Sequence, residues 1–168
     1  LELQSAGDVL FAQSSDEKEK LWYLRRRVGE AVKASSIYKE EDTVVPRARL
    51  PQLMDTVKSL GDEYGFRSIC YGHAGDGNLH INILKDDLSE EMWSDVLPVA
   101  IRKLFTEVVA LGGTLSGEHG IGLVQKAYMD IALSPPNLLM QRGIKGVFDP
   151  KGILNPGKIF PNESHERV

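Results

Sequence analysis

The sequence has a single cysteine, Cys70, among its 168 residues. One thiol excludes an intramolecular disulfide framework, and it excludes any zinc or iron–sulfur site built from several cysteines. No apolar run approaches the roughly 18 residues of a membrane span, and no signal peptide opens the chain, so we expect no transmembrane segment. The chain also has no excess of basic residues, and its net charge is -4. This charge argues against a general binder of nucleic acid or anionic membranes.

The composition that is present is that of a soluble globular domain, with 42% hydrophobic and 26% charged residues. A chain of this length can bury a core of its own. We expect one domain over residues 1–160, followed by a polar tail over residues 161–168. The first residue is Leu1 rather than Met, which predicts a piece of a larger protein.

The spacing of apolar residues predicts an α+β fold. Strands are expected over residues 9–12, 42–45, 68–71, 80–84 and 114–116. Helices are expected over residues 15–34, 51–65, 89–111, 123–133 and 137–148, and Pro98 should kink or restart the third of them. Because strands and helices do not alternate regularly, we predict an antiparallel β-sheet covered by helices on one face.

Glycine and histidine gather in two windows, residues 72–80 (GHAGDGNLH) and residues 116–122 (SGEHGIG). Three of the four histidines and eight of the 16 glycines lie between residues 72 and 122. Glycine lets the backbone turn tightly and approach a ligand closely, while histidine and carboxylate side chains bind metals or transfer protons. Either window alone is compatible with an ordinary surface turn, but the two together favour a functional site.

The strand expected over residues 80–84 supports this hypothesis. Its period-two alternation puts His80 and Asn82 on one face, and Ile81 and Ile83 on the other. Such a strand can pack on the core and present polar groups to a pocket. Two imidazoles and one carboxylate suit zinc, iron or manganese with positions left for substrate. A phosphate-binding loop is the weaker alternative, because neither window has the Gly-Lys-Ser/Thr or Gly-x-Gly-x-x-Gly spacing.

Both windows and a closing segment, residues 154–158 (LNPGK), resemble the C-terminal domain of the FAD-linked oxidases. This family contains D-lactate dehydrogenase, D-2-hydroxyglutarate dehydrogenase and the glycolate oxidase flavoprotein subunit. The resemblance includes Leu21-Trp22 followed by Arg25, and residues 42–50 (DTVVPRARL), so it covers about residues 8–160. It implies a ferredoxin-like sheet with added C-terminal helices. It also implies an FAD cofactor bound mainly by an N-terminal domain that is absent from this chain.

The resemblance implies roles for residues in both windows. His73, His80 and Glu118 would hold a divalent metal, with zinc expected and manganese or iron as alternatives. His119 would be the catalytic base that takes the hydroxyl proton of the substrate. We expect these four residues to lie close together on a solvent-accessible face that the FAD-binding domain would cover.

Four other residues match substrate or flavin positions of the family. Arg25 and Lys39 match cationic positions that hold the substrate carboxylate, a task for which a guanidinium fork is well shaped. A solvated helix face would explain Arg25 equally well. Asn82 matches a substrate-contacting position, and Asn155 matches the segment that returns to the flavin. The spacing from Arg25 to Lys39 is one residue shorter than in the hydroxyglutarate enzymes, which speaks against hydroxyglutarate as the substrate.

The function predicted from the sequence is that of a substrate- and metal-binding domain in an FAD-dependent enzyme. That enzyme would oxidise a 2-hydroxy acid, of glycolate or D-lactate type, to the 2-oxo acid, and the isolated chain would be inactive. An iron–sulfur electron-transfer subunit is a further expected partner, and the expected location is cytoplasmic or peripheral at the inner membrane. A stand-alone metal-dependent hydrolase and a non-catalytic binding module remain as alternatives.

Overall fold

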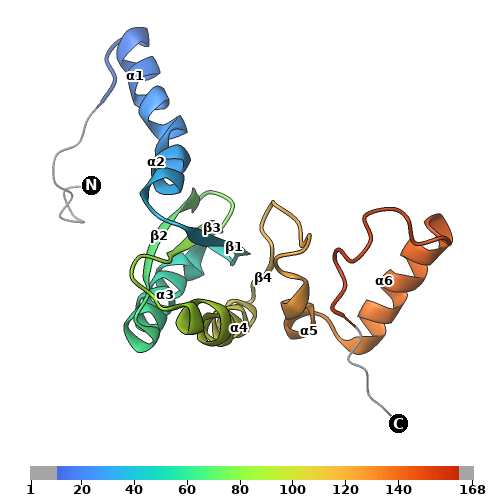
Figure 1. Ribbon diagram of the computed structural model, residues 1–168. Helices are drawn as coiled ribbons and strands as arrows, with labels where there is room; N and C mark the ends of the chain where they lie inside the picture. The colour runs from blue at the N-terminus through green and yellow to red at the C-terminus, as the bar shows by residue number, and fades with distance from the viewer. Residues whose placement is uncertain (1–10, 163–168) are drawn as a thin grey trace. The chain divides into compact units, whose positions relative to one another are not determined.

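The computed structural model of the chain describes residues 11–162. The chain forms two compact units, Leu1–Ser36 and Ile37–Val168, and each is described by itself (Figure 1). The first unit contains helices α1 (Ser15–Arg26) and α2 (Val28–Ser35). Ser14 caps α1, because its hydroxyl accepts the backbone N–H of Glu17 at 3.2 Å.

The single helix predicted over residues 15–34 is divided in two. The backbone N–H of Arg27 donates to the carbonyl of Leu24 at 3.1 Å, which tightens the last turn of α1 before α2 begins. Gly29 follows two residues later, and its low helix propensity weakens continuity at this point. Of the strand predicted over residues 9–12, residues 9 and 10 lie outside the described part, while Phe11 and Ala12 belong to no strand.

The second unit is built on a four-stranded sheet. Its strands are β1 (Tyr38–Val44), β2 (Arg67–His73), β3 (Asn78–Leu84) and β4 (Thr114–Leu115). They lie in the order β2-β3-β1-β4, and every neighbouring pair is antiparallel. Helix α3 (Leu50–Tyr64) connects β1 to β2, and α4 (Leu97–Ala110) connects β3 to β4. This order is the ferredoxin-like βαββαβ arrangement, which confirms the predicted α+β fold with an antiparallel sheet.

Helices α3 and α4 pack on the same face of the sheet (Figure 1). The odd-numbered residues of β3 (Leu79, Ile81 and Ile83) join the same buried cluster as the apolar stripes of both helices. The helical members of this cluster are Leu53, Val57 and Leu60 of α3, and Ala100, Ile101, Leu104, Phe105 and Val108 of α4. Since alternate residues of a strand face opposite ways, the even-numbered residues of β3 lie on the other face.

The helical segment predicted over residues 89–111 is interrupted, as expected, at Pro98. Ser89 caps it by accepting the backbone N–H of Met92 at 3.1 Å. A π-helical turn over Met92–Val96 precedes α4, which begins at Leu97. Because Pro98 has no N–H to donate to the preceding turn, the regular hydrogen-bond ladder has to restart here.

The prediction of one continuous helix over residues 123–133 is wrong. Turns occupy the start of this range, followed by a short 3-10 helix η4 (Lys126–Tyr128) and a single turn α5 (Met129–Ala132). Gly122 has a positive φ of 54°, and the side chain of Gln125 donates to the carbonyl of Asp42 at 3.0 Å. These features tie the segment to β1 and bring Tyr128 into the core. Helix α6 (Pro135–Phe148) then follows, and no helix among the described residues is long and apolar enough to cross a membrane.

One carboxylate is buried on the helix-covered face of the sheet. Glu41 of β1 lies opposite Ile81 of β3 and is only 1% exposed. Burial raises its pKa to about 8, because the interior disfavours the charged form, although Gln125 and Lys39 act in the opposite direction. The folded chain therefore holds this proton well into the neutral pH range.

Glu41 should make the stability of the fold depend on pH. The unfolded chain releases the Glu41 proton near pH 4.5, whereas the folded chain retains it up to about pH 8. Stability should therefore fall as the pH rises through this window, by up to about 1.4 kcal/mol per pH unit. Glu41→Gln should remove that loss, so urea titrations should show the variant gaining on the unsubstituted chain between about pH 5 and pH 8. Glu107→Gln, at an exposed position of α4, is the control, and an equal gain there would contradict the assignment to Glu41.

Candidate metal and catalytic site

Polar side chains gather on the face of the sheet opposite α3 and α4. In the strand register His80 of β3 lies between Asp42 of β1 and Tyr71 of β2, and Asn82 lies between Glu40 and Ile69. This confirms that His80 and Asn82 share one face while the isoleucines between them face the core. His80 was expected on a solvent-accessible face, but its side chain is only 5% exposed, which corrects that expectation for this residue. The side chain of Asn82 is buried as well.

The turn between β2 and β3 places His73 beside His80. The turn closes with the backbone N–H of Asp76 donating to the carbonyl of His73 at 2.9 Å. Gly77 has a φ of 75°, and a Cβ there would lie 1.9 Å from the carbonyl oxygen of Val45, so only glycine fits. The two imidazole rings meet edge to face, at 83° and 6.2 Å between centroids.

The loop after β4 brings Glu118 to both histidines. Its Oε1 lies 3.0 Å from His80 Nε2 and 3.6 Å from His73 Nε2. Gly117 allows the close approach, because a Cβ there would lie 2.0 Å from Asn78 Nδ2. The structure thus brings together the three residues predicted as metal ligands, although they come from two windows separated by more than 30 residues of sequence.

The donor set of His73, His80 and Glu118 fits a divalent transition metal. One ligand atom from each residue lies within 4.8 Å of the others. The His80 side chain is 5% exposed, whereas those of His73 and Glu118 are 42% and 47% exposed. Two imidazoles and a carboxylate on an accessible rim leave coordination positions for other molecules.

A second group could also hold a metal, because one ligand atom from each of Glu40, His80 and His119 lies within 4.8 Å of the others. Here the rings of His80 and His119 are stacked, at 17° and 4.7 Å between centroids. An imidazole nitrogen donates to a metal in the plane of its ring, so stacked rings converge on one ion less readily than rings that meet edge to face. The geometry therefore favours the first group as the metal site and leaves His119 beside it.

His119, the residue predicted as the catalytic base, lies beside this group with a partly exposed side chain. Its side chain is 49% exposed, and its Nε2 lies 3.9 Å from Glu118 Oε1. Its Nδ1 lies 3.9 Å from Glu40 Oε1. Both distances exceed those of hydrogen bonds, so neither carboxylate occupies an imidazole nitrogen.

Two acidic residues near this site, Glu40 and Asp42, were not predicted from the sequence. Glu40 Oε1 and Asp42 Oδ1 each lie 3.6 Å from His80 Nδ1. Burial works against the charge of Asp42, but hydrogen bonds from the backbone of His119 and Glu118, and from two polar side chains, outweigh it and lower its pKa. The period-two spacing of the two acids could have revealed them, had β1 been predicted to begin before residue 42.

Of the predicted substrate residues, Lys39 and Asn82 lie in this unit. Lys39 lies opposite Ile83 on the helix-covered face of the sheet, and therefore not on the face that carries His80. Its Nζ donates to the carbonyl of Trp93 at 2.7 Å and lies 4.7 Å from the Trp93 ring. Burial lowers its pKa. Lys39, Glu40 and His119 all line a cavity of about 480 Å³. Asn82 donates to the carbonyl of Ile69 at 3.2 Å, while its Oδ1 is buried without a hydrogen bond among the described residues.

Arg25 and Asn155 are not brought into this cluster by the described contacts. Arg25 belongs to α1 of the first unit, where its guanidinium lies 5.3 Å from the Trp22 ring. Asn155 has a φ of 46°, and its Oδ1 accepts a hydrogen bond from Lys158 Nζ at 3.1 Å. The roles of both residues stay predictions.

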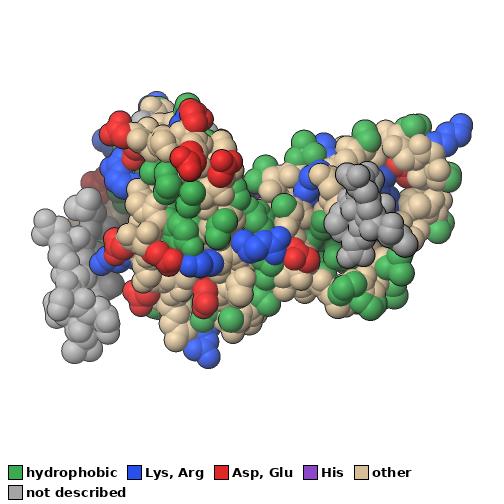
Figure 2. Space-filling view, turned by 60° about the horizontal axis from the view of Figure 1, so that its bottom comes forward, with side chains coloured by type: hydrophobic (Ala, Val, Ile, Leu, Met, Phe, Trp, Pro, Cys, Tyr) green, Lys and Arg blue, Asp and Glu red, His purple; other side chains and the backbone are tan. Residues whose placement is uncertain are grey.

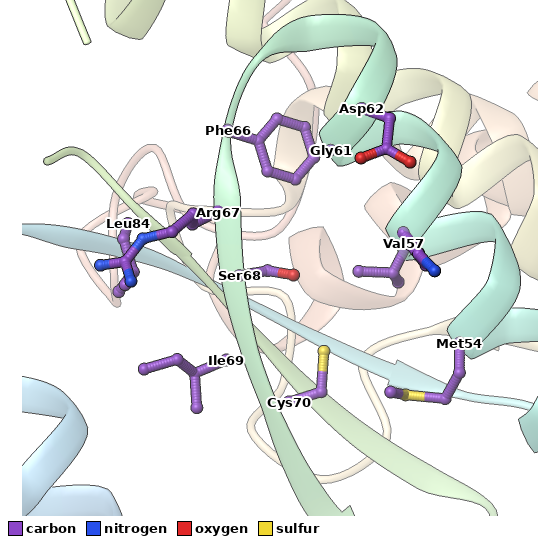
Figure 3. A pocket seen from close by; sticks show the side chains of 11 residues that line it. Met54, Val57, Gly61, Asp62, Phe66, Arg67, Ser68, Ile69, Cys70 and Leu84 are labelled. Atoms are coloured by element: carbon purple, nitrogen blue, oxygen red, sulfur yellow. The ribbon is translucent and has the colours of Figure 1, made fainter. Parts of the chain in front are cut away.

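A separate cavity of about 360 Å³ lies between α3 and β2 (Figure 3). Its wall includes Met54 from α3 and Cys70 from β2, with Arg67 at the end of the strand (Figure 3). Burial raises the pKa of the Cys70 thiol, which makes it a poorer nucleophile at neutral pH. None of the residues predicted for the functional site lines this cavity.

Comparison with known proteins gives one family match and several similar curated sequences. The family model described as FAD linked oxidases, C-terminal domain, matches residues 1–159. D-lactate dehydrogenase of Anaerostipes hadrus is 39% identical over 155 residues, which cover 92% of this chain and 33% of that protein. D-2-hydroxyglutarate dehydrogenase of Xanthomonas citri pv. viticola is 38% identical over 162 residues, covering 95% of this chain and 34% of that protein.

A third relative is the glycolate oxidase subunit GlcD of Escherichia coli, 36% identical over 159 residues. That match covers 93% of this chain and 31% of the relative. The chain therefore spans about a third of the length of the curated relatives it matches.

Proposed function

The chain belongs to the family of FAD linked oxidases, C-terminal domain, and we propose that it is the substrate- and metal-binding part of an FAD-dependent oxidoreductase. The proposed reaction oxidises a 2-hydroxy acid, of glycolate or D-lactate type, to the 2-oxo acid. One observation carries the proposal. His73, His80 and Glu118 converge within metal-binding distance of one another, with His119 stacked beside them.

The proposed metal ligands are the imidazoles of His73 and His80 and the carboxylate of Glu118. A divalent cation held there would bind the carboxylate and hydroxyl of the substrate and lower the pKa of the hydroxyl. Zinc is the ion we propose, since this donor set suits it, and the same donors would accept manganese or iron. Burial holds the His80 ring in place, while the partly exposed His73 and Glu118 leave the site open to substrate.

His119 is the proposed catalytic base. Its imidazole would take the proton from the substrate hydroxyl while the hydrogen on the neighbouring carbon leaves as hydride and the carbonyl forms. FAD supplies the hydride acceptor. The position of His119, stacked on a metal-ligating ring and free of a carboxylate partner within hydrogen-bond distance, supports this role.

Arg25, Lys39 and Asn82 are the proposed substrate-binding residues. Lys39 enters the proposal because it lines the same cavity as His119, although its Nζ is bonded to the carbonyl of Trp93 on the helix-covered face of the sheet. Asn82 lies two positions along the strand from His80. Its buried Oδ1 accepts no hydrogen bond from the described residues, so it is available to a substrate donor. Arg25 enters the proposal through the family resemblance alone.

Arg25→Ala should mainly raise the KM for the 2-hydroxy acid, because a carboxylate clamp binds substrate and transition state alike. The expected increase is roughly 10–100-fold, which corresponds to a hydrogen bond to a charged group. Arg26→Ala removes the neighbouring arginine, whose ion pair with Glu19 is exposed, and should leave KM unchanged. Steady-state kinetics of the flavin-containing protein would show both effects, and equal KM values in the two variants would place Arg25 on a solvated helix face.

An FAD-binding domain is the proposed partner of the apolar surface on the C-terminal part of the chain. Hydrophobic side chains are exposed over this part of the surface (Figure 2). In α6 they are Leu139, Met140, Ile144, Val147 and Phe148, each at least 60% exposed. Asn155, in the segment that follows α6, would contact the flavin. An apolar surface of this kind marks an interface rather than a solvated face. An iron–sulfur electron-transfer subunit, and a cytoplasmic or peripheral inner-membrane location, complete the proposal.

Anaerobic flavin reduction tests the proposed function. The protein, produced at the length of its relatives with FAD bound, would be mixed with glycolate, D-lactate and D-2-hydroxyglutarate while the flavin absorbance is followed. Glycolate or D-lactate should bleach the flavin, and a metal chelator should suppress the bleaching. Failure of all three acids to reduce the flavin would contradict the proposal, and metal-dependent ester or amide hydrolysis by the chain alone would favour the hydrolase alternative.

A further inference from the structure

The loop that carries Glu118 and His119 has an unfavourable backbone conformation. Ser116 has a φ of 57°, a left-handed conformation that costs a non-glycine residue energy. Gly117 is held so tightly against Asn78 and the backbone of Thr43 that a side chain has no room. A loop in this conformation needs specific contacts to hold it, because its own residues prefer other backbone angles.

Asp42 supplies most of these contacts. Its Oδ2 accepts the backbone N–H groups of Glu118 and His119, both at 2.8 Å, and the hydroxyl of Ser116 at 3.0 Å. Its Oδ1 accepts from Asn78 Nδ2 at 2.7 Å. The backbone carbonyl of Asp42 also accepts the N–H of Ser116 at 3.1 Å. With four donors on its two oxygens, this carboxylate holds the loop and has little capacity left to bind a metal itself.

The same carboxylate faces the central metal ligand. His80 Nδ1 is buried, has no hydrogen-bond partner among the described residues, and lies 3.6 Å from Asp42 Oδ1. A ligating imidazole normally directs its second nitrogen to a carboxylate or carbonyl, which fixes the ring orientation and the tautomer. Glu40 is at the same distance from His80 Nδ1, but Asp42 alone also holds the loop.

We propose that Asp42 is the positioning residue of the site, fixing Glu118 and His119 through their backbone and presenting its carboxylate to His80. This role rests on the proposed function, since it concerns the ligands and the base assigned there. One acid on β1 would thus hold a metal ligand from the first glycine-rich window together with a ligand and the base from the second. A small shift of Asp42 would move all three groups relative to one another.

Asp42→Asn is the direct test. An asparagine side chain has one acceptor oxygen, and its NH₂ group would face the donor groups of Asn78 or of the loop. The affinity of the chain for Zn²⁺, measured by calorimetric titration, should fall by about 10–100-fold, the range for losing an outer-shell partner. The visible absorption of Co²⁺ bound in place of zinc should change in shape, because it reports the geometry of the ligands.

Thr43→Val is the matched control, since it removes a buried hydrogen bond of the same strand, from Thr43 Oγ1 to the carbonyl of Leu79 at 2.8 Å. It should lower thermal stability while leaving zinc affinity and the cobalt spectrum unchanged. Should Asp42→Asn fail to fold, Ser116→Ala removes one donor from Asp42 without changing charge. That variant should lower zinc affinity severalfold relative to Thr43→Val.

The outcomes separate the two proposals. If the unsubstituted chain binds zinc, and Asp42→Asn or Ser116→Ala binds it as tightly as Thr43→Val does, the role of Asp42 is overturned while the metal site stands. If the unsubstituted chain does not bind zinc or cobalt, the proposed function itself is contradicted, and the role of Asp42 falls with it.

Discussion

Replacing His119 by asparagine in the flavin-containing protein is expected to lower kcat by about 10²–10⁴-fold, the usual loss when a general base is removed. Asparagine keeps a polar group in place but cannot take a proton near neutral pH. His119 stacks on the ring of His80 but is not one of the three proposed metal ligands, so the zinc content of the variant should be unchanged. Steady-state kinetics combined with metal analysis would measure both quantities in the same preparation.

Two results would contradict this role of His119. Full activity of the variant would remove the base from the mechanism and leave the metal alone to activate the hydroxyl. A loss of zinc in parallel with the loss of activity would instead place His119 among the ligands, as the alternative group with Glu40 and His80 requires.

The second large effect is expected at the metal ligands themselves. His80→Ala should weaken zinc binding by more than about 100-fold, because even outer-shell partners of a metal site contribute 10–100-fold. His73→Ala should weaken it less, since the half-exposed His73 ring can be replaced by water. In both variants excess zinc should restore part of the activity, because a weakened binding equilibrium responds to ligand concentration. A zinc titration of activity would show this recovery.

Asp76→Asn is the control for these ligand variants. Asp76 is an exposed acid in the turn between the two histidines and belongs to neither group of metal-binding residues. It should leave zinc affinity unchanged. A His80 variant with the zinc affinity of the unsubstituted chain would contradict the site, as would an Asp76 variant that loses zinc to the same extent.

The contrast between β3 and β1 shows what the sequence can reveal. The alternation of His80 and Asn82 with isoleucines has a period of two, so the faces of β3 could be assigned from the sequence alone. In β1 the residues Lys39 to Asp42 are all charged, and a run of charges does not indicate a central strand. The structure accommodates these residues in a central strand because burial raises the pKa of Glu41 to about 8 and because Asp42 is surrounded by hydrogen-bond donors, and both conditions depend on residues distant in sequence.

The grouping of the candidate site residues could be predicted from the sequence more completely than the helices and strands around them. Gly77 and Gly117 stand where a Cβ would clash, and the turns around them bring His73 and Glu118 beside His80, so the two glycine-rich windows could be recognised from the sequence. The roles of these residues in metal binding and catalysis stay predictions. Asp42 was not predicted because two of the four donors to its carboxylate are backbone N–H groups of the loop, which any residue type supplies, and because its strand was predicted to begin only at residue 42. The failed helix over residues 123–133 has a related cause, since long-range bonds of Gln125 to β1 overrode its local helix preference.

A crystal structure of the chain with zinc, with the ion located by anomalous diffraction, tests the central claim most directly. We expect one ion bound by His73, His80 and Glu118, with metal–nitrogen and metal–oxygen distances of about 2.0–2.2 Å and His119 next to it as a free imidazole. An ion held instead by Glu40, His80 and His119, or no ion on this face of the sheet, would contradict the account.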